Sequence, residues 1–419
     1  MTKQMKLGAF LMPTGHHIAA WRHPNSAADA GIDVDHMVRL AQTAERGLFD
    51  LVFFEDAAGV REARVELASQ ASRSIGFEPV SLLAALAART SSIGLVATAS
   101  TSYNEPYALA RAFATLDLVS GGRAGWNLVT SASEIEAANF GAQGLRAHRD
   151  RYALAGEFAG IVQALWSPST RFGTIGHAGE SFAVAQGLGV PASPQGSPVM
   201  VQAGSSDVGR DLAARTADVV FVAVQTLDAA KAFYDDVRAR TARAGRDPDR
   251  IKILPGMSPV VADSRAEAQE KFDELQSLIP DEVGLALLAS YLATDALDGL
   301  PLDGPMPDFK ANEGMHSRQQ LVIDQSRREG LSIRQVAQHF AGARGHWRLV
   351  GTASDVADEL EAWFKGGACD GFNVLPPYFP GELDIFVERV VPELQRRGLF
   401  RTSYEGATLR ANLGLGQSA

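Results

Sequence analysis

Eight short apolar runs, separated by segments of helix length, are the feature that most restricts the fold of this chain. The runs are nearly all apolar, as is typical of strands buried on both faces. They cover 7–12, 49–54, 93–99, 123–131, 198–203, 219–224, 251–262 and 371–375. Eight parallel strands joined by helical crossovers are the number that a (β/α)8 barrel requires. The sequence therefore predicts the α/β class and a TIM barrel, in preference to a doubly wound sheet.

Two segments interrupt the alternation of strands and helices. The first is a Gly/Pro/Ser-rich stretch at about 167–197, and the second, at about 265–350, separates the seventh run from the last crossover helix. Insertions of this size on a barrel usually shape the mouth of the active site. We therefore expect one domain, 1–419, with both insertions over the carboxyl face of the barrel.

Composition excludes several classes of function. The formal net charge of −10 lacks the basic footprint of a nucleic-acid-binding protein. No apolar run approaches the roughly 20 residues that span a bilayer, and the amino terminus has no signal-peptide pattern. Cys369 is the only cysteine, which excludes internal disulfides and cysteine metal clusters. We expect a soluble, cytoplasmic protein with no membrane partner.

Metal and nucleotide motifs are absent from the sequence. His16, His17 and His23 do not form an H-E-x-x-H pattern, so we expect no catalytic metal. The sequence also lacks a G-x-S-x-G elbow, a phosphate-binding P-loop and a Rossmann fingerprint. A phosphate-bearing cofactor in the mouth of a barrel is the remaining interpretation.

Polar residues gather where the predicted strands end. The carboxyl ends of parallel strands meet at one mouth, where α/β proteins hold their ligands. The residues are Asp56, Thr98, Asn127 to Ser131, Ser205, Ser206 and Asn373. Each is a weak signal alone, but together they predict a ring of hydrogen-bonding groups.

The turn from Gly204 to Arg210 is the strongest of these signals. Glycine permits a tight turn from strand to helix, so that the backbone amides and the hydroxyls of Ser205 and Ser206 can bind an anion such as phosphate. An ordinary helix N-cap explains the same residues equally well. His148 and Tyr152, in a polar segment before a helix expected at 153–166, supply donors for the same phosphate or form a solvated helix start.

Longer motifs along the chain resemble one known family. The chain is similar to the flavin-dependent monooxygenases of the nitrilotriacetate, EDTA and dibenzothiophene sulfone type, a branch of the bacterial luciferase-like superfamily. The motifs are Trp21-Arg22-His23-Pro24, 49–56, Ser100-Thr101-Ser102-Tyr103, 121–131, Asn139-Phe140-Gly141, His148 with Arg151-Tyr152, Gln202-Ala203-Gly204-Ser205-Ser206 and Asp370-Gly371-Phe372-Asn373. They follow the family order over nearly the whole chain.

The resemblance implies a luciferase-like barrel that binds reduced FMN (FMNH2) from a separate NAD(P)H-dependent flavin reductase. It implies a two-component monooxygenase that uses O2 to oxygenate a small organic or xenobiotic substrate. The FMN contacts that it implies are Asp56, Thr98, Asn127, His148, Tyr152, Ser205 and Ser206. The catalytic candidates are His16, Asn127 and His316, and Trp347 is placed near the pocket.

The chain departs from the alkane-oxidising relatives at two positions. Arg61 replaces a tyrosine and Ala132 replaces a histidine, which makes a plain alkane substrate unsuitable. An arginine at the mouth suits a carboxylate, sulfinate or sulfonate, or is a solvated surface residue. A deazaflavin- or flavin-dependent hydride-transfer enzyme and a non-catalytic flavin-binding protein stay open as alternatives. The family, together with the apolar segment 385–399, predicts a homodimer or homotetramer.

Overall fold

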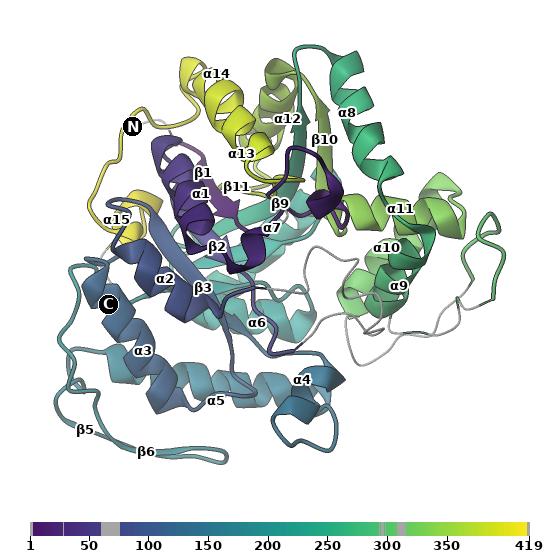
Figure 1. The fold of residues 1–419 in the computed structure, drawn as a ribbon. Helices are drawn as coiled ribbons and strands as arrows, with labels where there is room; N and C mark the ends of the chain where they lie inside the picture. Colours follow the sequence, from purple (N-terminus) through teal and green to yellow (C-terminus); the bar gives the residue numbers. More distant parts are fainter. Residues whose placement is uncertain are drawn as a thin grey trace.

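A closed parallel barrel of eight strands forms the centre of the computed structural model, which describes residues 3–27, 29–59, 76–292, 294, 297, 299–307 and 316–416 (Figure 1). The strands are, in order around the ring, β1 (Lys6–Phe10), β2 (Leu51–Phe54), β3 (Gly94–Ser100), β4 (Ala124–Val129), β7 (Val199–Gln202), β8 (Val219–Val222), β9 (Lys252–Val261) and β11 (Gly371–Val374). Pairing of β9 with both β8 and β11 closes the ring. The predicted barrel is confirmed, and each of the eight predicted runs overlaps one of these strands.

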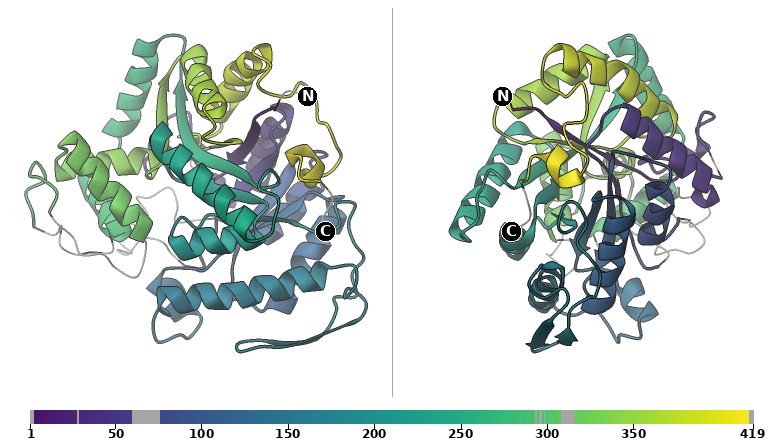
Figure 2. Two further views of the ribbon diagram at one scale, coloured as in Figure 1. Left: turned by 180° about the vertical axis from the view of Figure 1, so that it is seen from behind. Right: turned by 90° about the vertical axis from the view of Figure 1, so that its left-hand side faces the viewer.

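Crossover helices surround the barrel, as both views of Figure 2 show. They are α1 (Val34–Arg46), α2 (Pro79–Ala87), α3 (Pro106–Val119), α5 (His148–Trp166), α6 (Asp207–Thr216), α7 (Leu227–Arg243), α12 (Ala353–Lys365) and α14 (Val391–Arg396). Local sequence sets their ends: Pro79 and Pro106 occupy first turns, and Asp33 and Ser206 cap amide groups with their side chains.

The strand register decides which side chains lie inside the barrel. Phe10 pairs with Phe53, and Thr98 pairs with Asn127. The rings of Phe10, Phe53 and Phe221 meet at centroid distances of 4.8, 5.6 and 5.7 Å and fill the middle of the barrel. Side chains alternate between the two faces of a strand. Thr98 on β3 and Asn127 on β4 lie nearer the carboxyl ends of their strands, and therefore above the aromatic layer.

The carboxyl-terminal segment closes the amino end of the barrel. Helix α15 (Leu409–Leu413) places Leu409 against two glycines of the strands: a methyl group built on Gly94 would lie 2.3 Å from Leu409 Cδ1. A buried ion pair between Arg401 and Asp50 holds this segment. This segment therefore covers the starts of strands β2, β3 and β4.

Both segments expected to be insertions contain elements outside the eight-stranded ring. The first contains a two-stranded hairpin, β5 (Thr174–Ala178) with β6 (Ala183–Gln186). The second contains the helices α8 (Arg265–Ser277), α9 (Asp281–Leu292), α10 (His316–Glu329) and α11 (Ile333–Ala343), of which α9 to α11 stand beside the ring of helices in Figure 1. Helices α9 and α11 share a small apolar core of their own.

The second insertion ends in a strand that the sequence did not predict. Strand β10 (Trp347–Gly351) pairs with the last five residues of β9, outside the closed ring. Trp347 stacks on Trp363 of α12 at 4.0 Å. Its ring therefore packs against the surrounding helices, and the prediction that Trp347 lies near the pocket is wrong.

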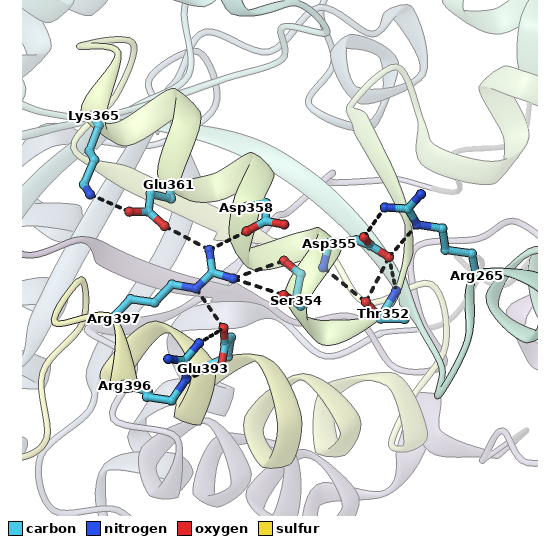
Figure 3. A network of polar contacts seen from close by, with 10 residues as sticks. All are labelled: Arg265, Thr352, Ser354, Asp355, Asp358, Glu361, Lys365, Glu393, Arg396 and Arg397. Atoms are coloured by element: carbon cyan, nitrogen blue, oxygen red, sulfur yellow. Dashed lines mark hydrogen bonds and ion pairs between the residues drawn. The ribbon is translucent and has the colours of Figure 1, made fainter.

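Ion pairs join the end of α14 to α12, another of the helices that surround the barrel. The guanidinium of Arg397, just after α14, donates to Asp358 at 2.7 Å and to Glu361 at 2.9 Å on α12 (Figure 3). The apolar residues of the preceding segment, including Phe386 and Leu394, are buried in the core of the same chain. Those side chains therefore do not form an exposed face, and the segment gives no support to the predicted oligomer.

The described helices contain no membrane span. None of them combines the length and the apolar character that crossing a bilayer requires.

Candidate functional site

The turn after β7 and the first turn of α5 form one polar cradle, made by His148, Tyr152, Gly204, Ser206 and Gly209. Ser206 Oγ lies 3.5 Å from His148 Nε2, and the rings of His148 and Tyr152 lie 4.8 Å apart. A methyl group built on Gly204 or Gly209 would lie 3.2 or 3.0 Å from the Tyr152 hydroxyl. We call this group the phosphate cradle, because its hydroxyls surround the amino end of α6, where anions bind favourably.

The first turn of α5 differs from the sequence prediction. The segment ending at Tyr152 is not irregular, because the helix begins at His148 and not at Ala153. Residues four apart lie on one face of a helix, which explains why both His148 and Tyr152 reach the cradle. The polar composition of this turn obscured its helical geometry.

The N-cap interpretation of Ser206 is confirmed, and the anion site stays a prediction. The Ser206 hydroxyl accepts a hydrogen bond from the Gly209 amide at 3.3 Å and therefore caps α6. Ser206 and Ser205 are only half-buried, and Ser206 Oγ also lies within 3.5 Å of His148 Nε2. A cap and an anion site are compatible because one hydroxyl both accepts and donates.

A second polar group lies inside the barrel on the neighbouring strands. Asn127 Nδ2 donates to Thr98 Oγ1 at 2.8 Å, and Thr98 Oγ1 donates to the Phe54 carbonyl at 2.8 Å. The buried Oδ1 of Asn127 has no hydrogen-bond partner within the described residues. Asn373 Oδ1, on β11, is a second buried oxygen of this kind. Buried oxygens normally have partners, so these two indicate positions for a ligand or water.

Two hydroxyls extend this polar wall toward the mouth. Ser131 has a left-handed backbone, with φ of 45°, and its Oγ donates to Ser100 Oγ at 2.8 Å. Residues other than glycine adopt this conformation at a cost, and such strain is frequent at functional sites. Tyr103, in the loop that follows Ser100, stacks on Phe140 with the ring centroids 4.7 Å apart. This contact brings two of the sequence motifs together.

Asp56 lies apart from the buried groups. It follows β2 and is exposed at the mouth, next to a loop whose Ala58 amide donates to Glu136 of α4 (Glu134–Asn139) at 3.0 Å. Arg61 lies outside the described residues. The side chain of His316, at the start of α10, also lies outside the described part of the chain, so its candidate role is not addressed by the geometry.

An ion-paired cluster at the mouth was not found by sequence reasoning. Arg344, from the loop after α11, donates through Nη2 to both oxygens of Glu55, at 2.9 and 2.8 Å, and through Nη1 to His16 Nδ1 at 3.2 Å. His16 is fully buried, and its Nε2 donates to the Phe10 carbonyl at 2.8 Å. We call Met12, His16, Glu55 and Arg344 the mouth cluster. No local pattern pairs residues 289 positions apart, so only the fold reveals it.

The histidines near the amino terminus have separate roles. Burial lowers the pKa of His17 to about 4, and its Nε2 lies 2.9 Å from Gln276 Oε1 of α8. His17 is therefore a neutral structural residue that joins the amino-terminal loop to the insertion. Within the described ranges, no three His, Cys, Asp or Glu side chains gather closely enough to hold a metal ion.

Comparison with known proteins identifies the family. A sequence profile described as luciferase-like monooxygenase matches residues 8–369. The chain belongs to the luciferase-like monooxygenase family. The resemblance seen in the motifs is confirmed, and relatives include monooxygenases of EDTA and of dibenzothiophene sulfone.

Individual relatives match the luciferase-like chain over nearly its full length. It is 44% identical to N-acetyl-S-(2-succino)cysteine monooxygenase of Bacillus subtilis (strain 168), with 99% of this chain and 97% of the relative covered. It is 45% identical, over the same shares, to nitrilotriacetate monooxygenase component A of Aminobacter aminovorans. The structure of riboflavin lyase with modified FMN and its substrate riboflavin superposes with a TM-score of 0.88 at 30% identity, covering 99% and 97% of the two chains. This luciferase-like chain is therefore an oxidoreductase enzyme.

Proposed function

We propose that this chain is the oxygenating component of a two-component monooxygenase that uses reduced FMN and O2. A separate NAD(P)H-dependent flavin reductase supplies the reduced FMN, and the substrate is a small organic or xenobiotic compound. The observation that carries this proposal is the convergence of Ser206, His148 and Tyr152 on one helix start, beside the strands that hold Thr98 and Asn127. Relatives named as monooxygenases, one of them as a component A, support it.

The residues present fit FMN at both ends of the molecule. In the phosphate cradle, Gly204 and Gly209 have no side chains, so the space beside the Tyr152 hydroxyl can hold an anion. Inside the barrel, Asn127 offers a buried acceptor to an N–H group, which a flavin ring carries. The flavin supplies the redox chemistry with O2.

The chain's own residues bind, orient and exclude water. We assign the phosphate to His148, Tyr152, Ser205 and Ser206, whose hydroxyls and amides lie at one helix start. We assign the ring to Thr98 and Asn127, with Asp56 at the exposed edge. The aromatic layer beneath them keeps the floor of the pocket dry.

His16, Asn127 and His316 remain the proposed catalytic residues. Asn127 is the strongest candidate because its Oδ1 is buried and has no partner within the described residues. We place His16 beside the reacting part of the ligand, where its ring packs on Phe10 at 4.4 Å. We further propose a homodimer or homotetramer in the cytoplasm, where NAD(P)H is available. Light scattering measures the assembly.

Binding of FMN and riboflavin to the ligand-free protein tests the phosphate cradle. Each lost hydrogen bond to phosphate costs about 1.5 kcal/mol, so Tyr152→Phe and Ser206→Ala should each weaken FMN binding by about tenfold. Riboflavin lacks the phosphate, so its affinity should stay unchanged.

Two matched controls separate the site from general damage. Tyr234→Phe removes a hydroxyl that donates to Asp370, and Ser264→Ala removes the N-cap of α8, both away from the cradle. The controls should leave FMN affinity intact. Unchanged FMN affinity in both cradle variants would remove the phosphate site and, with it, the proposed cofactor.

A turnover assay separates the proposed oxygenase from the alternatives. Substrate-dependent consumption of O2 with chemically reduced FMN supports the monooxygenase. Hydride transfer without O2 would instead favour a deazaflavin enzyme, and stable flavin binding without turnover would favour a binding protein.

A further inference from the structure

Arg344 is a buried arginine in an unfavourable backbone conformation. It caps the end of α11 with φ of 54°, in the left-handed region that glycine normally occupies at this position. A residue other than glycine there costs on the order of 1 kcal/mol. The side chain has only 5% exposure. Contacts made by this side chain must therefore offset both the strain and the burial of its charge.

Those contacts join three distant parts of the chain. Nη2 donates to both carboxylate oxygens of Glu55, at the end of β2, and Nη1 donates to Met12 Sδ at 3.2 Å and to His16 Nδ1 at 3.2 Å, in the loop after β1. The four Nη hydrogens thus have four acceptors. The Glu55 carboxylate balances the charge, which is the condition for a stable buried pair.

The donors and acceptors around His16 determine its protonation state. Arginine only donates, so Nδ1 of His16 must be an acceptor without a hydrogen. The Phe10 carbonyl only accepts, so Nε2 must carry the hydrogen that it donates at 2.8 Å. One tautomer alone satisfies both neighbours.

We infer that Arg344 is a positioning residue that holds His16 as the neutral tautomer with hydrogen on Nε2 and fastens the second insertion to the barrel mouth. His16 held in this way accepts no proton from a substrate, so its proposed catalytic role is to position the reacting part of the ligand by packing and not to remove a proton. For turnover, the inference rests on the proposed function: a fixed neutral imidazole brings neither positive charge nor a mobile proton to the oxygenation site.

Nitrogen-15 NMR of the histidine side chains tests the inference in the ligand-free protein at neutral pH. His16→Gln identifies the His16 signals. In the unmodified protein we expect a single neutral tautomer, with hydrogen on Nε2. Arg344→Met should convert these signals to those of a tautomer mixture or an imidazolium. A wild-type spectrum with hydrogen on Nδ1, or an unchanged spectrum in Arg344→Met, would overturn the inference.

A second variant covers the case in which the single substitution does not fold. Arg344→Met takes the guanidinium away from the partly buried carboxylate of Glu55, whereas Arg344→Met with Glu55→Gln removes both charges. The double variant should also release the tautomer. Arg334→Met is the matched control, because Arg334 lies on the same helix and pairs with Asp303 at 3.0 Å on the surface. The control should keep the wild-type His16 signals.

Attachment of the insertion gives an independent measurement. Amide hydrogen exchange at the carboxyl end of α11 should become faster in Arg344→Met and remain unchanged in Arg334→Met, because Arg344 holds that end and Arg334 lies at the other. Equal exchange rates in wild type and Arg344→Met would contradict the fastening role.

Kinetics then connect the inference to the proposed reaction. Misplacement of groups at the mouth should lower kcat in Arg344→Met by about 10²-fold, while FMN affinity changes less than about threefold. An unchanged kcat would contradict a positioning role. If the wild-type protein binds no FMN, the proposed function fails, but the NMR and exchange results still decide the role of Arg344.

Discussion

Asn127 and Thr98 are joined by a hydrogen bond across neighbouring strands, with Asn127 Nδ2 donating to Thr98 Oγ1 at 2.8 Å. Thr98 Oγ1 passes the interaction on by donating to the Phe54 carbonyl at 2.8 Å. This relay of two hydrogen bonds fixes the orientation of the Asn127 amide. The hydrogen of Thr98 Oγ1 is donated to Phe54, so this oxygen can only accept from Asn127 Nδ2. The amide oxygen is then the group available to a ligand.

Thr98→Val should break this relay while keeping the shape of the side chain. The Asn127 amide would lose its acceptor, so we expect a loss of about 1–3 kcal/mol in the free energy of unfolding. The freed amide can rotate, so affinity for reduced FMN should fall by about tenfold. Urea unfolding and anaerobic FMN titration measure the two effects.

Thr101→Val is the control for this substitution. Thr101 is buried and donates to the Val129 carbonyl at 3.2 Å, in the loop after β3. Its loss should lower stability by a similar amount and leave FMN affinity unchanged. Equal loss of FMN affinity in both variants would show that the relay has no specific role.

Asp117 should make stability depend on pH. Burial raises the pKa of this carboxyl to about 6, against the opposing effect of hydrogen bonds from Ser193, the Ala124 amide and Gln195. In the folded protein it therefore holds a proton between about pH 4 and about pH 6 that the unfolded chain releases. Its contribution to stability is present at low pH and is lost as the pH rises through that window.

Asp117→Asn should remove this dependence, because an amide does not ionise. A shift of this size corresponds to about 3 kcal/mol, so the variant should gain up to that amount relative to wild type between about pH 4 and pH 7. Urea unfolding of both proteins across this range measures the difference. A difference that stays constant with pH would show that the Asp117 carboxyl titrates normally.

The fold was predictable from the sequence because the arrangement of apolar residues indicates which segments are strands and which are helices. Each buried strand is a short apolar run, and the polar residues that follow belong to one rim by the geometry of parallel strands. Thr98 with Asn127, and Ser206 with His148, therefore come together as the motifs predicted.

What the sequence could not predict depends on contacts between distant segments. The pairing of Arg344 with Glu55 and His16 has no local signal. Strand β10 adds to β9 outside the ring, which turned Trp347 away from the pocket toward Trp363. Helix α5 begins at His148, earlier than predicted. Its first turn is polar, so the spacing of apolar residues did not indicate that this turn is helical.

Arg240 should raise FMN affinity by neutralising an acidic residue beside the phosphate cradle. Asp207 begins α6, immediately after Ser206, and its Oδ1 lies 2.9 Å from Arg240 Nη2 and 3.0 Å from Arg210 Nη2. Without Arg240, this carboxylate would repel the phosphate more strongly. Asp207 is 77% exposed, so solvent screens the effect.

Arg240→Gln should therefore weaken FMN binding by only about two- to fivefold at low salt, and the difference should vanish at about 0.5 M salt. Arg238→Gln is the control, since Arg238 lies on the same helix and pairs with Asp249. Titrations of both variants at two salt concentrations make the measurement. A salt-independent loss would point to a structural change in α6 instead.

Two arginines four residues apart should differ greatly in their effect on stability. Arg401 has 1% exposure and pairs with fully buried Asp50. Arg397 instead binds three carboxylates that are all partly exposed to solvent, as Figure 3 shows. Arg401→Met leaves a buried carboxylate whose pKa burial already raises. We expect a loss of about 3–5 kcal/mol in the free energy of unfolding.

Arg397→Met should cost only about 1 kcal/mol, because its partners Asp358 and Glu361 remain accessible to water, and added salt should reduce this loss. Urea unfolding of both variants at low and high salt measures the contrast. The buried pair should decide stability although it has fewer contacts, because water cannot replace the missing partner. Equal losses for Arg397→Met and Arg401→Met would contradict this ranking and would mean that water reaches Asp50 at the closed end of the barrel.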